Sequence, residues 1–365
     1  MSKAWVLHNV GDIRYEEVEK PLPSAGEVLI RVMTAGICSS DIPRIYTTGT
    51  HKMPLVPGHE FSGVVTEVGS NADPALIGRR VAVYPKISCG KCAKCLEGHP
   101  EMCVDYDYTG SRRDGAFAEY VTVPVQNLME LPDDVTFEQG AMIEPMAVAV
   151  NAFFTGICDS RSVVMLDSPV AVCGLGPIGL MLIMLLKDMG YENILAIGNR
   201  GSQLDLAKTL GVKDNLLIDS RSENVQDRIR LLTGESLACF YECTGRNEGA
   251  VYGMESLSTG GKLILVGNPD TDMSFAKDTY WNILKNQITV CGIWNSTFPH
   301  AGADELKVDD WTYALEKIKT GKINPEKLIS HRLSLHELEK GLLIMRDRTE
   351  DRCKIMLTVQ NRSAT

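Results

Sequence analysis

Four cysteines stand within fifteen residues, as Cys89, Cys92, Cys95 and Cys103. The C-x2-C-x2-C-x7-C spacing allows four thiolates to close a tetrahedral metal site that has no open position. Two lysines between these cysteines would offset the negative charge of such a site. An iron–sulfur cluster is the rival interpretation, because C-x2-C-x2-C also occurs in those proteins. We predict a structural zinc ion here.

A second set of potential ligands is spread more widely and consists of Cys38, His59, Glu60 and Glu144. Cysteine, histidine and carboxylate side chains suit a catalytic zinc site, which has three protein ligands and one open position. Taken singly, Cys38 is an ordinary core cysteine and His59 an ordinary turn histidine. Glu144 lies in an apolar stretch, where a carboxylate is costly unless something such as a metal satisfies it. Together, ahead of a glycine-rich turn, they favour a second metal site.

The glycine-rich turn follows an apolar run at 170–173 and precedes an apolar helical pattern that ends at Gly190. A strand, a tight turn and a helix in this order bring the backbone close to a pyrophosphate at the helix N-terminus. An ordinary strand-to-helix turn is the alternative. We expect the turn to bind a dinucleotide through Gly174, Gly176, Pro177, Ile178 and Gly179.

The next strand ends in Gly198-Asn199-Arg200. NAD-binding proteins usually have a carboxylate near this place, about 20 residues after the glycines, to bind the ribose 2′-hydroxyl. Here no acid stands at the strand end, and Arg200 is able to pair with a 2′-phosphate. The pattern predicts NADP rather than NAD. A solvent-facing arginine with NAD bound less tightly is the alternative.

Two adjacent arginines, Arg112 and Arg113, occupy a turn that follows the cysteine segment. The ordinary interpretation is a solvated turn. An anion-binding loop is the alternative, because arginine guanidinium groups match phosphate geometry. A third arginine, Arg44, follows Cys38 closely, and we regard the three as candidates for contact with a substrate phosphate.

Length, composition and charge indicate the class of protein that carries these groups. The chain has 365 residues, which favours two domains. Its net charge of −10 argues against a general binder of nucleic acids or anionic membranes. The longest apolar run, 178–186, is too short to span a bilayer. The chain starts in a strand-like segment with no signal-peptide pattern, and its eleven cysteines fit a reducing compartment. We therefore expect a cytoplasmic protein.

Short alternating strands fill the first 35 residues, and strands alternate with helices after the glycine turn. This order predicts an α/β protein with a β-rich first domain and a doubly wound parallel sheet. We expect a catalytic domain over 1–151 with a metal lobe at about 86–108, a cofactor domain over 152–292, and a return to the first domain over 293–365.

The chain resembles the zinc-containing medium-chain alcohol and polyol dehydrogenases over essentially its whole length. The motifs that carry the resemblance are 58–63 (Gly-His-Glu-x-x-Gly), the four-cysteine segment, Glu144-Pro145 and the glycine turn. The resemblance implies a GroES-like β-domain and a Rossmann domain. It also implies a catalytic zinc on Cys38, His59 and Glu144, with Glu60 beside it as a ligand or as a group exchanging with one.

The resemblance further implies that Ser40 contacts the substrate oxygen and starts a proton relay. Many family members have a histidine three residues later, but this chain has Pro43, so we expect water to complete the relay.

The strings at 40–45, 108–115 and 328–332 are similar to those of members that act on sugar-alcohol phosphates. The expectation is a homodimeric or homotetrameric enzyme with two zinc ions per chain. It would interconvert a polyol phosphate and a ketose phosphate with NADP(H) or NAD(H). An unphosphorylated polyol or secondary alcohol is the alternative substrate. A non-catalytic nucleotide-binding protein on the same fold is the alternative of another class.

Overall fold

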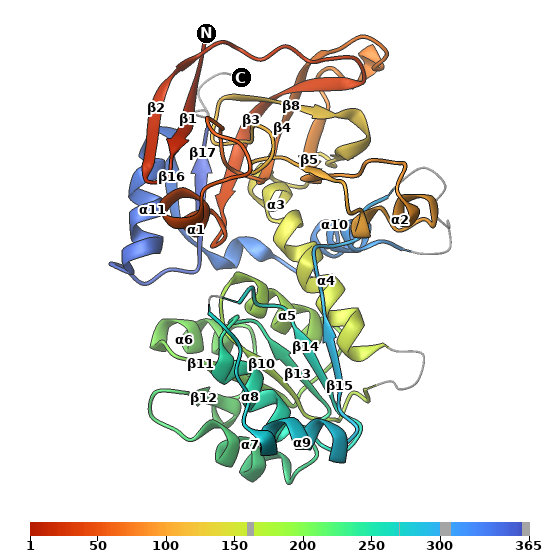
Figure 1. Ribbon diagram of the computed structural model, residues 1–365, viewed down its shortest axis with the longest axis vertical. Helices are drawn as coiled ribbons and strands as arrows, with labels where there is room; N and C mark the ends of the chain where they lie inside the picture. The colour runs from red at the N-terminus through yellow and green to blue at the C-terminus, as the bar shows by residue number, and fades with distance from the viewer. Residues whose placement is uncertain (159–163, 270, 300–307, 360–365) are drawn as a thin grey trace. The chain divides into compact units, whose positions relative to one another are not determined.

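The computed structural model describes residues 1–158, 164–269, 271–299 and 308–359. The chain divides into two compact units (Figure 1). Unit 1 consists of Met1–Pro145 and Thr297–Thr365, and unit 2 of Met146–Ser296. The division falls inside helix α4, Ile143–Ile157.

Unit 1 is built around a seven-stranded mixed sheet with the order β16-β17-β3-β4-β5-β9, in which β8 also pairs with β3. Strand β3 is buried along most of its length and pairs antiparallel with β4, β8 and β17. The last strand of the chain therefore lies beside the third. The strands of this sheet are β3 (Glu27–Ile37), β4 (Glu60–Val68), β5 (Arg80–Val83), β8 (Tyr120–Pro124), β9 (Leu128–Glu130), β16 (Ile329–Ser334) and β17 (Lys354–Thr358).

Two small antiparallel sheets, five α-helices and several short 3-10 or π-helical turns complete the described part of unit 1. The sheets are β1 (Ser2–Asn9) with β2 (Asp12–Val18), and β6 (Lys86–Ile87) with β7 (Asp107–Tyr108). The helices are α1 (Asp41–Pro43), α2 (Ala93–Leu96), α3 (Phe137–Ala141), α10 (Asp310–Lys319) and α11 (Leu338–Asp347). The core under the sheet is apolar and includes Trp5, Phe61 and Phe117.

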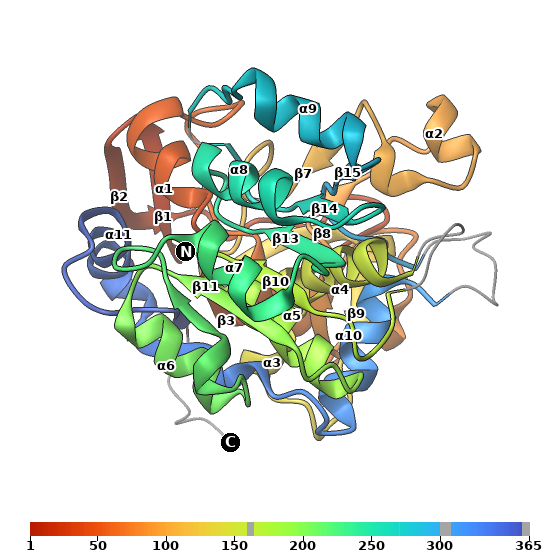
Figure 2. The ribbon, with the colours of Figure 1, turned by 90° about the horizontal axis from the view of Figure 1, so that it is seen from below.

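Unit 2 holds a six-stranded parallel sheet with the order β12-β11-β10-β13-β14-β15. This is the strand order of a doubly wound dinucleotide-binding fold. Figure 2 shows α8 and α9 on one face of this sheet and α5 and α6 on the other. The strands are β10 (Val170–Cys173), β11 (Ile194–Gly198), β12 (Leu217–Asp219), β13 (Cys239–Glu242), β14 (Lys262–Leu265) and β15 (Thr289–Gly292). The helices after α4 are α5 (Pro177–Asp188), α6 (Gly201–Thr209), α7 (Val225–Thr233), α8 (Asn247–Ser256) and α9 (Lys277–Lys285).

The chain between Thr136 and Ile157 forms two helices, α3 and α4, with a break between them. Thr136 and Gln139 form a capping box that starts α3. Met142 caps the C-terminus of α3, and α4 begins at the next residue. This break places Glu144 in the first turn of a new helix.

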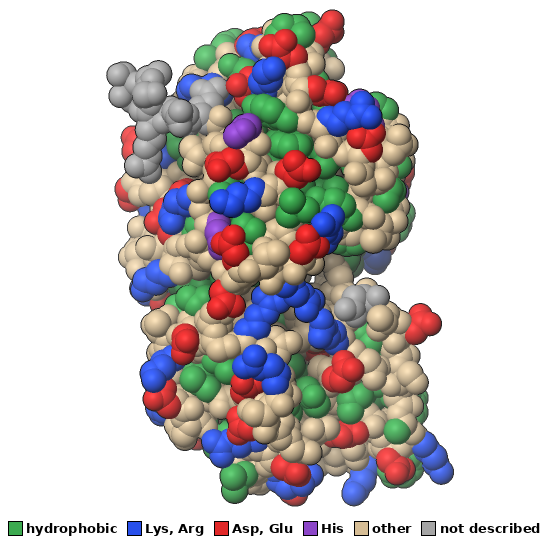
Figure 3. All heavy atoms as spheres, turned by 90° about the vertical axis from the view of Figure 1, so that its left-hand side faces the viewer, with side chains coloured by type: hydrophobic (Ala, Val, Ile, Leu, Met, Phe, Trp, Pro, Cys, Tyr) green, Lys and Arg blue, Asp and Glu red, His purple; other side chains and the backbone are tan. Residues whose placement is uncertain are grey.

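The predicted fold class, an α/β protein with a parallel doubly wound sheet, is confirmed. Among the described residues no helix is both long and apolar enough to cross a membrane. Acidic and basic side chains are interspersed over much of the face shown in Figure 3.

Candidate active site

The register of three strands assembles the first group of candidate ligands. Strands β3 and β4 are antiparallel, and Gly36 on β3 lies opposite Glu60 on β4. Cys38 follows the end of β3 and His59 precedes the start of β4, so both lie at the same end of the pair. Their ligand atoms and that of Glu60 all lie within 4.8 Å of one another.

This group suits a metal ion in its donor chemistry, since thiolate, imidazole and carboxylate are the ligands that zinc takes. A second observation concerns His59, whose buried Nδ1 atom has no hydrogen-bond partner among the described atoms and lies 3.5 Å from Asp41 Oδ1. A carboxylate behind the histidine is the arrangement that orients metal-binding imidazoles. Asp41 was absent from the sequence-based set, although it stands next to Ser40.

The protonation of His59 opposes metal binding. Burial alone would lower the pKa of His59, but Asp41 and Cys38 outweigh burial and raise this pKa well above its usual value. A ligand imidazole must be neutral on the side that binds the metal. In metal-free protein Asp41 and Cys38 therefore favour the protonated form of the imidazole.

Glu60 is not a free carboxylate. It pairs with the Lys354 ammonium, and both side chains are 2% exposed. Lys354 also donates a hydrogen bond of 3.2 Å to the carbonyl oxygen of Ile37. The pair lies against Gly36, where any side-chain carbon would collide with both partners. Strand β17 brings Lys354 here because Ile355 lies opposite Ile37.

Glu144 is 7% exposed and lies outside the compact group of ligand atoms. Burial raises the pKa of its carboxyl to about 7, and the neighbouring Glu60 acts in the same direction, while His59, Lys354 and Arg44 act against it. The site therefore holds two glutamates of different character: one is held by a lysine, and the other is buried with a raised pKa.

Ser40 lies between the ligand cysteine and a cation. Its hydroxyl donates to Cys38 Sγ over 3.2 Å and accepts from Arg44 Nη1 over 3.0 Å. The ring of Tyr108 packs edge-on against that of His59, with 5.8 Å between the ring centroids. Burial raises the pKa of Tyr108 well above its usual value, and Glu144 adds to this effect. Tyr108 therefore remains a neutral hydrogen-bonding group at this site.

The four cysteines of the second candidate metal site also lie within 4.8 Å of one another. Cys92 Sγ is 3.5 Å from Cys95 Sγ and 3.9 Å from Cys103 Sγ. A tetrahedral ion with Zn–S bonds of about 2.3 Å keeps its sulfurs roughly 3.8 Å apart. These separations fit one tetrahedral ion, and they leave little room for a cluster of several irons.

The buried positive charge near this cysteine group comes from a lysine that was not predicted from the sequence. The two lysines between the cysteines, Lys91 and Lys94, are exposed and pair with Asp105 and Glu97. Lys86 is instead 2% exposed. Burial lowers the pKa of Lys86, while Cys103, Cys95 and Cys92 are among the groups that raise it. The buried cation beside the thiols is therefore Lys86.

In unit 2 the glycine turn has the geometry that a phosphate site needs. Gly174 has a φ of +97°, and a side chain there would collide with Thr244 and Cys243. Gly176 caps α5 and faces open space, and Pro177 is the first helical residue. A helix N-terminus with an open approach is a site for an anion. Gly179 lies against the carbonyl of Gly174, where no larger residue fits.

At the end of β11, Gly198 packs against Leu175 and accepts hydrogen bonds from the amide and hydroxyl of Ser220. Close packing therefore explains this glycine, besides any room it leaves for a phosphate. Asn199 is exposed, and Arg200 is half-buried at the N-cap of α6. Within the described part of the chain Arg200 makes no ion pair or hydrogen bond through its guanidinium.

The three candidate phosphate-binding arginines lie in different environments. Arg113 pairs with Glu27 over 2.6 Å and also donates to the Thr122 carbonyl. Arg112 stacks over the ring of Tyr106, with 4.4 Å between Cζ and the ring centroid. Arg44 alone of the three contacts Ser40.

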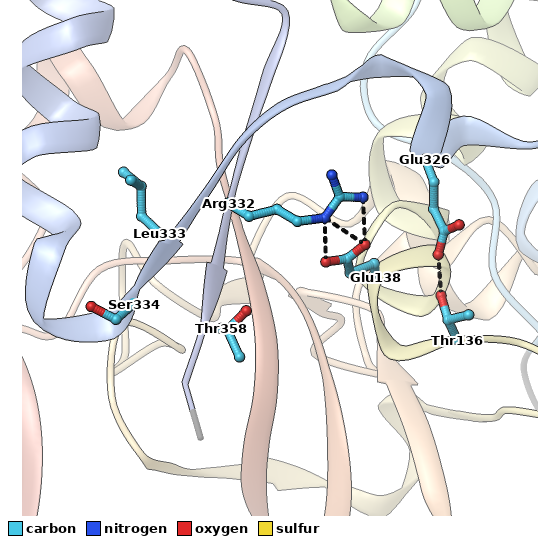
Figure 4. A pocket seen from close by; sticks show the side chains of 7 residues that line it. All are labelled: Thr136, Glu138, Glu326, Arg332, Leu333, Ser334 and Thr358. Atoms are coloured by element: carbon cyan, nitrogen blue, oxygen red, sulfur yellow. Dashed lines mark hydrogen bonds and ion pairs between the residues drawn. The ribbon is translucent and has the colours of Figure 1, made fainter. Parts of the chain in front are cut away.

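A further hollow in unit 1 is lined mainly by polar side chains (Figure 4). Arg332 forms a bidentate pair with Glu138, and Thr136 donates to Glu326. Because its charged groups satisfy one another, we assign this hollow no role in the chemistry. The residues that line it are Thr136, Glu138, Glu326, Arg332, Leu333, Ser334 and Thr358.

Two family models match the chain. The model of the alcohol dehydrogenase GroES-like domain covers residues 24–133, and that of the zinc-binding dehydrogenases covers residues 177–317. Galactitol 1-phosphate 5-dehydrogenase of Escherichia coli K12 is 33% identical over 330 residues, which are 90% of this chain and 91% of that protein. Sorbitol dehydrogenase of Bacillus subtilis is 29% identical over 93% of this chain and 92% of its own length.

Solved structures agree with these matches. The crystal structure of galactitol-1-phosphate dehydrogenase from Escherichia coli superposes with a TM-score of 0.86 at 30% identity, covering 98% of this chain and 100% of that one. A protein of Sinorhizobium meliloti 1021 described as a zinc-binding dehydrogenase, bound to NADP, gives a TM-score of 0.85 at 26% identity, with coverages of 98% and 99%.

Proposed function

Because this chain belongs to the zinc-binding medium-chain dehydrogenases, a family of oxidoreductases that act on alcohols, we propose that it interconverts a polyol phosphate and a ketose phosphate. The observation that carries the proposal is the compact group of Cys38, His59 and Glu60 next to the Ser40 hydroxyl. The 33% identity to galactitol 1-phosphate 5-dehydrogenase supports a phosphorylated substrate.

When bound, zinc would act as a Lewis acid on the substrate hydroxyl, and the nicotinamide would accept the hydride from the substrate carbon. Ser40 Oγ accepts the hydroxyl proton, because it is the hydroxyl that contacts the ligand cysteine. Asp41 orients the His59 ring. Cys38 and His59 would hold the metal, while Glu60 and Glu144 are both candidates for the third ligand. Lys354 restrains Glu60, and its release would allow the two glutamates to exchange.

The four-cysteine group would hold a second, structural zinc ion, which gives two per chain. For the cofactor we propose NADP(H) in preference to NAD(H), bound at the glycine turn, with Arg200 pairing with the 2′-phosphate. The Arg200 guanidinium, which has no partner among the residues that the structure describes, and the NADP-bound relative support this choice. The eleven cysteines, all free thiols in the structure, support a reducing, cytoplasmic compartment.

The second candidate function is oxidation of an unphosphorylated polyol. It is favoured by the engagement of Arg113 with Glu27, which removes one of the three candidate phosphate contacts, and by the similarity to sorbitol dehydrogenase. Arg44 then remains the arginine best placed for a phosphate, since 27% of its side chain is exposed and only one of its N–H groups contacts Ser40.

The test is a kinetic screen of sugar-alcohol phosphates, their unphosphorylated forms and the matching ketoses, each with NADP and NAD. We expect turnover that chelation abolishes and zinc restores, with a higher kcat/KM for phosphorylated substrates. Equal efficiency on both forms would support the second candidate. The absence of turnover on every substrate would favour a non-catalytic nucleotide-binding protein on this fold.

We also propose that the chain forms a homodimer through β15, an outer strand of the parallel sheet in unit 2. The segment from Thr289 to Trp294 carries no charge, although charged residues usually protect such edges. Val290 is 39% exposed, and Trp281 on the preceding helix and Trp294 are 57% and 61% exposed.

The size of this apolar area suits a second copy of the chain. Burial of these side chains with Tyr280 and Leu284 would remove roughly 500 Å² per copy from water. About 1,000 Å² over two copies reaches the lower limit for a specific interface. An edge strand can pair with its own copy about a two-fold axis, because the exposed row of amides and carbonyls is then shared symmetrically.

A further inference from the structure

Arg44 occupies the place where a proton relay would continue from Ser40. Its Nη1 donates to Ser40 Oγ over 3.0 Å and lies 3.8 Å from Asp41 Oδ1. The residue before it is Pro43, whose side chain has no proton acceptor. Arg44 also begins a five-residue π-helical turn, Arg44–Thr48, directly after α1. π-Helical turns are rare in proteins, and many of those that occur lie at functional sites.

We propose that Arg44 is a positioning residue that fixes the Ser40 hydroxyl for proton transfer. The inference rests on the proposed dehydrogenase function and adds a role that is independent of any substrate phosphate. A serine hydroxyl normally rotates to suit its neighbours. Here Arg44 donates to one lone pair of Oγ, and the Ser40 hydroxyl donates its hydrogen bond to Cys38 Sγ. The second lone pair is then left in a fixed direction for the substrate hydroxyl.

The transfer of the substrate's hydroxyl proton needs no protein base other than Ser40. The substrate O–H bond breaks as its proton moves to the free lone pair of Ser40 Oγ, and the Ser40 O–H bond, which points to Cys38 Sγ at rest, breaks as that proton leaves to water. The hydride leaves the carbinol carbon for the nicotinamide, and the substrate becomes a ketone. Arg44 does not carry the proton, because a guanidinium stays protonated. Its positive charge instead stabilises negative charge on the oxygens while the proton moves. The partial exposure of the arginine side chain places this step within reach of water.

A double-mutant cycle tests the role. We expect Arg44→Met to lower kcat roughly ten- to a hundredfold, the effect of one charge-assisted hydrogen bond, on phosphorylated and unphosphorylated polyols alike. In a Ser40→Ala background the same change should cost almost nothing, because the group it positions is gone. Arg44→Lys should retain an intermediate kcat, and added guanidinium ion should partly restore Arg44→Met.

The matched control is Arg346→Met. Arg346 packs against the same π-helical turn, with Cζ 4.6 Å from the Tyr46 ring centroid, and pairs with Asp347, not with Ser40. It should keep wild-type kcat. Additive effects of the two changes in the cycle would overturn the proposal. A loss confined to phosphorylated substrates would do the same, because Arg44 would then be only a phosphate contact.

A spectroscopic readout separates this proposal from the proposed function. In cobalt-substituted protein, Ser40→Ala removes the hydrogen bond to Cys38 Sγ and should shift the thiolate-to-cobalt charge-transfer band. Arg44→Met should shift the band in the same direction, and Arg346→Met should not. If wild-type protein turns over no polyol but these shifts occur, the dehydrogenase proposal fails while the positioning of Ser40 stands. An unchanged band in Arg44→Met overturns the positioning role.

Discussion

Replacement of Lys354 by methionine should destabilise unit 1 strongly in metal-free protein. The change leaves the Glu60 carboxylate buried at 2% exposure without its counter-charge. Breaking a buried pair by removing one partner costs about 3–5 kcal/mol. For a unit of this size each kcal/mol lowers Tm by about 2–4 °C, so we expect a fall of roughly 6–20 °C.

Calorimetry with and without zinc provides the measurement. A divalent ion beside Glu60 supplies another positive charge, so the loss of Tm should be smaller in zinc-loaded protein. Glu60→Gln added to Lys354→Met should recover most of the stability, because the unpaired charge is removed.

The matched control is Lys20→Met. Lys20 pairs with Glu67, which lies on strand β4 as Glu60 does. The side chains of Lys20 and Glu67, however, are 34% and 42% exposed. An exposed pair contributes about 0–1 kcal/mol, so Tm should fall by no more than about 4 °C. If Lys354→Met lowers Tm no more than Lys20→Met does in metal-free protein, the buried pair stabilises unit 1 no more than an exposed pair does.

Metal analysis should find about two zinc ions in the wild type and about one in Cys38→Ser, whereas Cys95→Ser should aggregate because a closed metal site contributes folding free energy; full metal content and activity in Cys38→Ser would refute the catalytic site. Arg200→Ala should shift the ratio of kcat/KM values for NADP and NAD toward NAD by roughly ten- to a hundredfold, and a wild-type preference for NAD would contradict the cofactor proposal. Val290→Lys should convert the dimer to monomer in light scattering, since it places a charge on the exposed strand edge; an unchanged mass would place the interface elsewhere. Arg113→Ala should lower Tm and reduce activity equally on phosphorylated and unphosphorylated substrates, because Arg113 holds Glu27; a selective loss on the phosphorylated form would restore its role as a phosphate contact.

The features predicted most fully from the sequence are those whose residues lie close together in the chain. The cysteine segment and the glycine turn each place their groups within fifteen residues, so short-range geometry brings those groups together. The fold class followed in the same way from the alternation of strands and helices. Cys38, His59 and Glu60 were selected as a set of residue types, and their proximity depends on the register of β3 against β4.

The pairs that escaped prediction join residues far apart in the chain. Lys354 is 294 residues from Glu60, and Arg113 is 86 residues from Glu27. No local pattern marks either partner, because the contacts arise from sheet pairing. Helix α9 and strand β15 were also not selected, since their exposed apolar residues lack the buried periodicity on which the other assignments rested.

Gly36 couples three positions of the chain through space. Its missing side chain provides the space in which Glu60 and Lys354 meet. A substitution at any one of these positions changes what the other two tolerate. In an alignment of relatives, glycine at 36 should therefore covary with a carboxylate at 60 and a long cation at 354. Lineages that lose the pair should be the ones in which alanine or a larger residue appears at 36. Substitutions at these three positions, though the positions are distant in the chain, would then occur together.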